Sequence, residues 1–211
     1  MLNRSSDGLR DGEESVAGDA ALVASLKSGH PEAPAVFFDS YGEYVERLLL
    51  RVLGPDHEAE DLLHDVFVQA FANIGQLRDP SRLKAWLARM TVFVARGALR
   101  RRRRGRWLVF MPAQELPDQK STSTPPESRD LLDRVFAVLH GLHPNDRIAF
   151  SLRYIEGLTL PEAAGAAGVS LATFKRRLKK SDNAFLARAQ HHDHALYETL
   201  LETPRWRNPH E

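Results

Sequence analysis

The chain contains no cysteine, which excludes disulfide bonds, a thiolate metal site and a cysteine nucleophile. Long apolar runs are also missing, since no stretch approaches the ~18 consecutive apolar residues that predict a membrane-spanning helix. Residues 1–8 lack the apolar centre of a secretory signal peptide. Phosphate-binding loops, dinucleotide-binding glycine motifs and nucleophile elbows are absent as well. We therefore expect a cytoplasmic protein that has no cofactor, does not insert into membranes and is not an enzyme.

The charges nearly cancel, so their positions matter more than their sum. There are 29 lysines and arginines against 28 aspartates and glutamates, for a net charge of +1. Residues 1–20 are acidic on balance, whereas the basic clusters lie between Arg100 and Lys180. Local basic patches, rather than net charge, govern contact with nucleic acid. The composition is therefore compatible with DNA binding.

Residues 159–180 have the layout of a helix, a tight turn and a second, strongly basic helix. Thr159 and Glu162 form a capping box, Gly168 suits a helix exit, and Ser170 can cap the second helix. In a helix-turn-helix, the second helix enters the major groove of DNA. The alternative is an amphipathic hairpin with a solvated basic face, but both caps and the one-sided charge favour DNA binding. The residues expected to face DNA are Ser170, Ala172, Thr173, Lys175, Arg176, Lys179 and Lys180.

The spacing of apolar residues predicts helices throughout and no strand, so the expected fold class is all-α. Predicted helices cover residues 21–27, 36–53, 57–74, 82–104, a segment around 131–139, and 144–155, followed by the helix-turn-helix. We expect two small helical domains joined by a flexible linker. The predicted boundaries are a disordered tail over 1–18, a first domain over 19–110, a linker over 111–128, a second domain over 129–190, and a tail over 191–211 that either extends the last helix or frays.

The linker prediction rests on four prolines mixed with serine and threonine in residues 111–128. Fully extended, this segment could span roughly 60 Å at about 3.3 Å per residue. That exceeds one DNA turn of about 35 Å. The two domains could therefore sit on separate stretches of one duplex.

Residues 58–71 combine a wide apolar stripe with an exposed acidic face. The exposed positions are Asp61, His64, Asp65, Val68 and Gln69. Such a face could dock a basic partner helix, and the alternative is an ordinary solvated surface, which the spacing alone would favour.

These motifs together resemble a known family. Residues 58–71 are similar to region 2 of bacterial RNA polymerase sigma factors of the extracytoplasmic-function group, and residues 83–90 resemble the group's Trp-Leu segment. Residues 159–180, preceded by residues 153–158, resemble region 4. The resemblance covers about residues 19–106 and 129–187, with the motifs in the family's order.

The resemblance implies that the chain binds core RNA polymerase and promoter DNA. The face of residues 58–71 would contact the polymerase, the first domain the proximal −10 element, and the helix-turn-helix the distal −35 element. Residues 75–82 correspond to a loop that captures a flipped base, and the following helix could hold phosphates of the displaced strand. The implied −10 contacts are Gln76, Leu77, Arg78, Arg82, Lys84, Arg89, Arg96 and Arg100. Such factors commonly also have an anti-sigma partner.

The chain departs from the family pattern at several positions. Phe93 stands where the family usually has Asn, Gly97 where an Asp usually follows, and Asp182 where a basic residue is usual. Pro34 replaces an aromatic residue. Two rival interpretations follow: a stand-alone helix-turn-helix regulator, and a sigma-derived interaction protein that has lost promoter opening.

Three further clusters allow more than one interpretation. The arginine run 100–104, with Arg106, would cover every face of a helix, so it indicates phosphate contact for part of the run or a solvated helix end. Residues 191–194, His-His-Asp-His, could suggest a metal site but are more typical of a solvated tail. The carboxylates of Glu58, Glu60 and Asp61 could suggest a nuclease, but they fit a single amphipathic helix. We expect neither a metal nor a catalytic residue.

Overall fold

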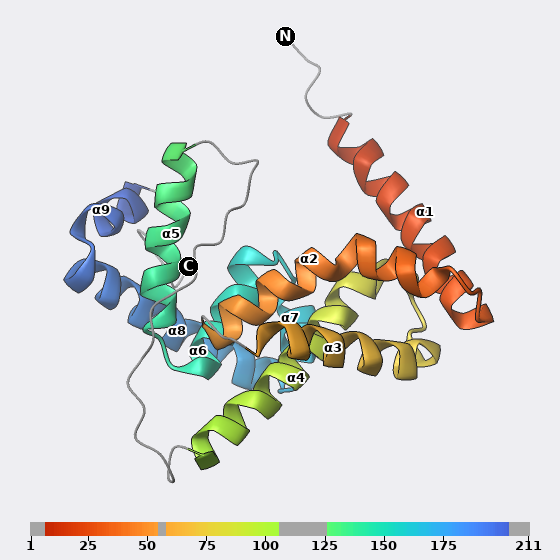
Figure 1. Ribbon diagram of the computed structural model, residues 1–211. Coiled ribbons are helices and arrows are strands. Elements are labelled where there is room, and N and C mark those ends of the chain that lie inside the picture. Colours follow the sequence, from red (N-terminus) through yellow and green to blue (C-terminus); the bar gives the residue numbers. More distant parts are fainter. Residues whose placement is uncertain (1–6, 55–57, 106–125, 203–211) are drawn as a thin grey trace.

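The computed structural model describes residues 7–54, 58–105 and 126–202, and all regular structure in these residues is helical (Figure 1). The α-helices are α1 (Asp7–Ser28), α2 (Ala33–Leu53), α3 (Ala59–Asn73), α4 (Leu83–Gly105), α5 (Pro126–His140), α6 (Pro144–Phe150), α7 (Leu160–Ala166), α8 (Leu171–His192) and α9 (His194–Glu202). Three short turns are the 3-10 helices η1 (Ile74–Gln76) and η2 (Pro80–Arg82) and the π-helix η3 (Ser151–Ile155). The predicted all-α class is confirmed.

Helices α1 to α4 with η1 and η2 form what we call the N-terminal unit. Helix α2 packs against α3 and α4 because its apolar residues recur at helical spacing on one side. The buried residues of that side include Phe37, Val45, Leu48, Leu49 and Val52. In α4, the hydroxyl of the buried Thr91 donates to the carbonyl of Leu87 at 2.9 Å, so this polar side chain is satisfied within its own helix.

Helix α1 begins at Asp7 and takes in much of the stretch whose composition predicts disorder. Its second half is anchored: Val23 is buried, and the Tyr41 hydroxyl donates to the Asp19 carboxylate at 2.5 Å. Nucleation is the costly step of helix formation, so an anchored turn can propagate into poorly patterned sequence. The difference from the sequence prediction therefore has a physical cause.

Helices α5 to α9 with η3 form the C-terminal unit. Its own small core contains Leu139, Phe150, Phe185 and Leu196. The sequence left open whether the tail extends the last helix, and the structure ends α8 at His192 and starts α9 at His194. Between them, both carboxylate oxygens of Asp193 accept from Arg134 of α5, at 2.6 and 2.5 Å. Residues 203–211 of the predicted tail lie outside the described residues.

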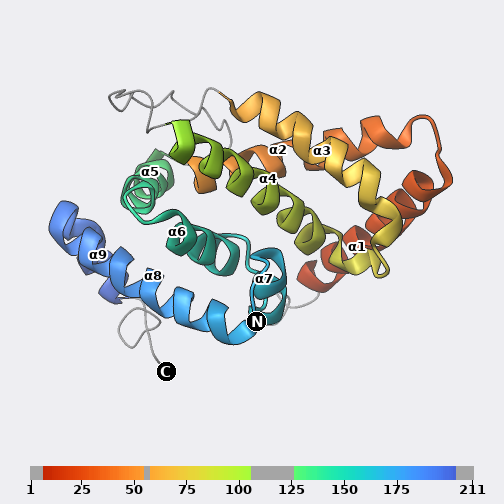
Figure 2. The ribbon, with the colours of Figure 1, turned by 90° about the horizontal axis from the view of Figure 1, so that it is seen from below.

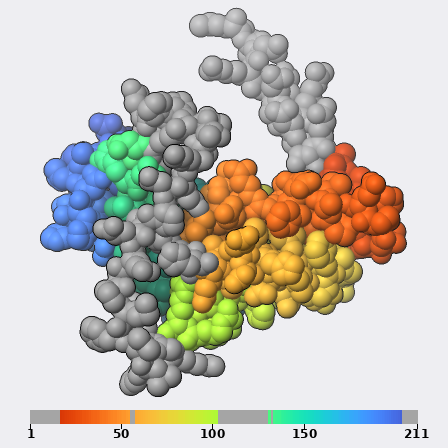
Figure 3. All heavy atoms as spheres, in the orientation of Figure 1, coloured from red at the N-terminus to blue at the C-terminus, as the bar shows by residue number. Residues whose placement is uncertain are grey.

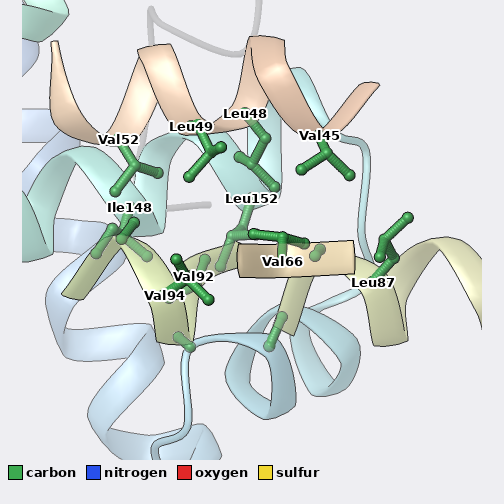
Figure 4. Packing of buried hydrophobic residues seen from close by; sticks show 14 of the residues in the cluster. Val45, Leu48, Leu49, Val52, Val66, Leu87, Val92, Val94, Ile148 and Leu152 are labelled. Atoms are coloured by element: carbon green, nitrogen blue, oxygen red, sulfur yellow. The ribbon is translucent and has the colours of Figure 1, made fainter. Parts of the chain in front are cut away.

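The two units share one hydrophobic core, which the sequence did not predict. Figure 4 shows Ile148 and Leu152 of the C-terminal unit among side chains of α2 and α4. Their neighbours in the cluster include Val45, Leu48, Leu49, Val52 and Val92. In the view from below, α4 runs beside α7 (Figure 2). The predicted domains are thus packed together, α2 against α6 and α4 against α7. Figure 3 shows α2 to α4 on one side of this face and α5, α8 and α9 on the other.

Polar contacts also join the units. Arg51 of α2 forms an ion pair with Glu156, which follows η3. Arg96 of α4 donates to the carbonyl of Ala167, at the C-terminal end of α7. Residues 106–125, which include Arg106 and most of the predicted linker, lie outside the described residues.

Candidate nucleic-acid interface

The helix-turn-helix predicted for residues 159–180 is present as α7, a turn and α8. The Thr159 hydroxyl accepts from the Glu162 amide at 3.4 Å, and the Glu162 carboxylate accepts from the Thr159 amide at 2.9 Å. The Thr159 hydroxyl also donates to that carboxylate at 2.6 Å, and this hydrogen bond, with the one from the Thr159 amide, lowers the pKa of Glu162. Gly168 has a φ of +60°, and Ser170 caps α8 by accepting from the Thr173 amide at 3.2 Å. The local signals in the sequence therefore found both caps and the turn.

The outer face of α8 is basic and open to solvent. Figure 2 shows α8 along one edge of the molecule. Phe174 and Leu178 are buried on the inner face, which orients the opposite side outward. The exposed residues among those predicted to read DNA are Ser170, Ala172, Lys175, Arg176, Lys179 and Lys180. Thr173 is half-buried, with its hydroxyl 2.9 Å from that of Ser170.

Lys180 and Leu171 differ from the other residues of this face. The Lys180 ammonium lies 3.0 Å from the carboxylate of Asp146, so its charge is already compensated within the chain. Leu171, at the start of α8, is an exposed apolar residue that the sequence reasoning did not single out. An apolar side chain at this position could contact a thymine methyl group in a major groove.

Asp182 lies on the inner side of α8. Its side chain is buried, and one carboxylate oxygen accepts from the Tyr154 hydroxyl at 2.8 Å. The acidic residue that replaces a usual basic one therefore belongs to the interior of the C-terminal unit. It is not part of the exposed basic face.

The basic residues predicted on α4 differ in their surroundings. Lys84, Arg89 and Arg100 are exposed. Arg96 is half-buried and bonded to Ala167, so its guanidinium already has a partner in the other unit. Burial lowers the pKa of Arg96, and the nearby charges of Arg177 and Arg100 lower it further. Arginine still remains charged at neutral pH.

The arginines at the end of α4 also differ in their exposure to solvent. Arg100 and Arg101 are exposed. The Arg102 guanidinium is half-buried and lies 3.8 Å from the Glu58 carboxylate at the start of α3. Part of the run thus belongs to the protein's own packing.

The loop between α3 and α4 is held by its own short turns. Gln76 and Arg78 are exposed, and Gln76 donates to the Asn73 side chain at 2.9 Å. Arg82 lies 3.3 Å from Asp79. Leu77 is buried, and its carbonyl accepts from Lys27 of α1 at 2.5 Å. Leu77 anchors the loop, while the other three predicted residues point to solvent.

The predicted polymerase-facing residues gather on the outer face of α3. Asp61, His64, Asp65, Val68 and Gln69 are all exposed there.

Aromatic side chains that the sequence reasoning did not connect with this face lie beside it. Phe71 and Phe38 are both exposed in part. The ring centroids of Phe38 and Phe67 are 4.9 Å apart, and those of Phe67 and Phe71 are 6.1 Å apart. The acidic face is therefore bordered by an aromatic patch where α2 and α3 meet.

Asp193, within the histidine-containing segment 191–194, is held by Arg134 of α5. The hydrogen bonds from the Arg134 guanidinium lower the Asp193 pKa to about 2. Within the described residues, no group of three or more His, Cys, Asp or Glu side chains is placed to hold a metal ion. The same part of the chain has no helix long and apolar enough to cross a membrane.

Comparison with known proteins assigns both units to one family. The Sigma-70 region 2 model matches residues 37–105, and the Sigma-70 region 4 model matches residues 132–181. The chain is 30% identical over 150 residues to the RNA polymerase sigma factor CarQ of Myxococcus xanthus, covering 69% of this chain and 82% of that protein. The chain belongs to the sigma-70 family, in its extracytoplasmic-function group.

Other relatives agree with this assignment. The ECF RNA polymerase sigma factor SigW of Bacillus subtilis is 24% identical over 171 residues, covering 77% of this sigma factor and 91% of that one. The fold is similar to that of the sigma factor RpoE from Bartonella quintana, solved with the anti-sigma factor NepR. The TM-score is 0.59 at 21% identity, and the alignment covers 75% of this chain and 98% of that chain.

The family models do not cover all of this sigma factor's structure. Region 2 takes in most of α2 through α4, and region 4 takes in most of α5 through the first half of α8. Helices α1 and α9 lie outside both matches. They nonetheless pack on the two units, α1 against α2 and α9 against α5 and α8.

Proposed function

We propose that this sigma factor binds core RNA polymerase through the outer face of α3 and directs it to promoters. The loop of residues 75–82 and the exposed basic residues of α4 would contact the −10 element, and the outer face of α8 the −35 element. The observation that carries the proposal is the pairing of two exposed basic helices, α4 and α8, on the two units that match regions 2 and 4.

The proposed mechanism needs only binding by this chain. Basic residues on α4 and α8 would neutralise DNA phosphates, and such contacts give affinity that falls steeply with salt. The early residues of α8 would read base edges in the major groove. The chemistry of RNA synthesis would stay with the polymerase, in the cytoplasm where promoter DNA is found.

Domain boundaries follow from the same proposal. We take residues 19–110 as the region 2-like domain and 129–190 as the region 4-like domain, with 111–128 as the linker between them, whose last three residues are the start of α5. The matched ranges 37–105 and 132–181 fall inside these limits.

An anti-sigma factor is a further proposed partner. A similar fold has been solved with one, and the acidic and aromatic surface of α3 and α2 is open to solvent in this chain. A protein that covers this surface would compete with the polymerase for it.

The test is transcription by purified components. The chain is mixed with bacterial core polymerase and genomic fragments, and promoter-dependent transcripts and co-migration with core are measured. Asp65→Arg should abolish co-migration because it reverses the charge of the α3 face. The matched control is Glu46→Arg, an exposed position on α2, which should behave as the unaltered chain.

Two outcomes would reject the proposal. If the chain neither co-migrates with core nor yields a transcript, it does not direct polymerase to promoters. If it binds DNA through Arg176 but never engages polymerase, it is a stand-alone regulator.

A further inference from the structure

Phe93 is the most exposed large apolar side chain in the part of the chain that the structure describes, at 62%. It lies in the middle of α4, where its neighbours Val92 and Val94 are buried. Helix α4 therefore packs against the core through the residues on either side of Phe93, and Phe93 itself faces solvent. An aromatic ring held in water on a rigid helix is available to a ligand.

Arginines surround this ring along the helix. Arg89 precedes Phe93 by four residues and Arg100 follows it by seven, spacings that place all three on one side of a helix. Both arginines are exposed. At about 1.5 Å per residue, the stripe from Arg89 to Arg100 is roughly 16 Å long. The ring therefore lies within a cationic stripe.

Room exists beside the ring because the residue one turn further on is glycine. A Cβ built at Gly97 would meet only the Arg101 guanidinium, at 3.7 Å. A flat group could thus lie against Phe93 without displacing a side chain at position 97. Phe93 itself can neither donate nor accept a hydrogen bond from its side chain.

These features fit one kind of occupant, a single nucleic-acid strand. Aromatic rings in a basic groove stack on bases, and arginines take the phosphates. A duplex does not fit, because its base faces are covered by stacking within the helix. The negative charge of the strand matches the stripe.

We propose that Phe93 is a stacking platform for one unstacked base of promoter DNA, with Arg89 and Arg100 holding flanking phosphates. This inference rests on the proposed function and adds to it a contact with the opened strand. Stacking tolerates any base, because every base has a π-face. The contact is therefore independent of base identity at that position.

The test uses a fluorescein-labelled single strand of about 12 nucleotides and its duplex, a length within the range of single-strand sites. Anisotropy at low salt gives the affinity of the full chain for each. Phe93→Ala should weaken single-strand binding about tenfold and leave duplex binding within about twofold. Phe93→Trp should keep binding, and Phe93→Leu, which lacks the π-face, should lose it. Leu131→Ala, an exposed apolar position on α5, is the matched control.

An abasic nucleotide gives a more direct readout. Scanned along the strand, it should weaken binding of the unaltered chain at one position, and Phe93→Ala should remove that loss. The inference is overturned if Phe93→Ala or Phe93→Leu binds the single strand as the unaltered chain does, or if Phe93→Ala weakens duplex binding equally.

Association with core polymerase is measured in parallel. If the chain binds polymerase and Phe93→Ala leaves its single-strand affinity unchanged, this inference alone is overturned. A chain that stacks through Phe93 but never binds polymerase overturns the proposed function alone.

Discussion

Arg51 on α2 and Glu156 after η3 form a buried ion pair between the two units, although 105 residues separate them in the sequence. Their side chains are 15% and 3% exposed. Burial raises the pKa of Glu156 and lowers that of Arg51, and each charge opposes the shift of the other. Each charge is thus tolerated because its partner is present.

Removing one member of this pair should be costly. Arg51→Ala removes the ion-pair partner of the buried Glu156 carboxylate, and such changes lower the free energy of unfolding by about 3 kcal/mol. Urea unfolding measures this value. The control is Arg82→Ala, whose side chain is 66% exposed and 3.3 Å from Asp79, and which should change stability by about 0.5 kcal/mol or less.

A double variant separates loss of the pair from loss of packing. Arg51→Met with Glu156→Leu leaves no buried charge, so it should recover most of the stability. Equal losses in the single and double variants would show that the ion pair does not determine the effect.

The contact between the units should weaken in mild acid because of His140 on α5. Burial lowers its pKa, the charge of Arg147 lowers it further, and a hydrogen bond to the Leu50 backbone opposes both. The folded state therefore prefers neutral His140. The stability it gives is present above the ordinary pKa of 6.5 and is lost as the pH falls through the lowered value.

Urea unfolding between about pH 7.5 and 5.5 tests this dependence, since exposed carboxylates titrate below that range. His140→Gln should flatten the curve, whereas His64→Gln, an exposed histidine on α3, should leave it unchanged. A curve with the same slope in the His140 variant would contradict the prediction.

Two glycines in the helix-turn-helix should respond oppositely to alanine. Gly168 has a φ of +60°, so Gly168→Ala should destabilise by about 1–2 kcal/mol through left-handed strain. Gly165 lies within α7, and a Cβ there meets nothing within 4 Å, so Gly165→Ala should stabilise by about 0.5–1 kcal/mol. Thermal and urea unfolding give both signs. The same sign for both would mean that the turn is not built as described.

The reading face of α8 can be checked at Arg176. Arg176→Ala should weaken binding to duplex containing the −35 element and reduce the dependence of log K on log salt by about 1. Fluorescence anisotropy over a salt series measures both quantities. Arg47→Ala, remote on α2, should leave the slope unchanged, and an unaltered slope for Arg176→Ala would place the reading face elsewhere.

Sequence signals were enough to predict those elements that depend on interactions between residues close together in the chain. The capping box of Thr159 and Glu162, the glycine turn and the outward basic face of α8 all depend on residues a few positions apart. The exposed acidic face of α3 follows from the same periodicity. These features could therefore be predicted.

Features that depend on packing between distant residues could not be found this way. Nothing near Arg96 in the sequence indicates that it bonds to Ala167, 71 residues away. The burial of Leu77 likewise depends on α1, which lies far from it in the sequence. Spacing places Phe93 on the same side of α4 as Arg89 and Arg100, but its 62% exposure came only from the structure.

The shared core also determines the order in which the protein can fold. Contacts within the N-terminal unit close short loops, whereas the Arg51–Glu156 contact closes one of 105 residues, which costs more chain entropy and slows its formation. During synthesis, the first unit is made and can fold before its covering surface exists. The parts of α2 and α4 that α6, η3 and α7 cover must therefore stay exposed until those elements leave the ribosome. A chain truncated before α6 would present these parts to chaperones or to other chains.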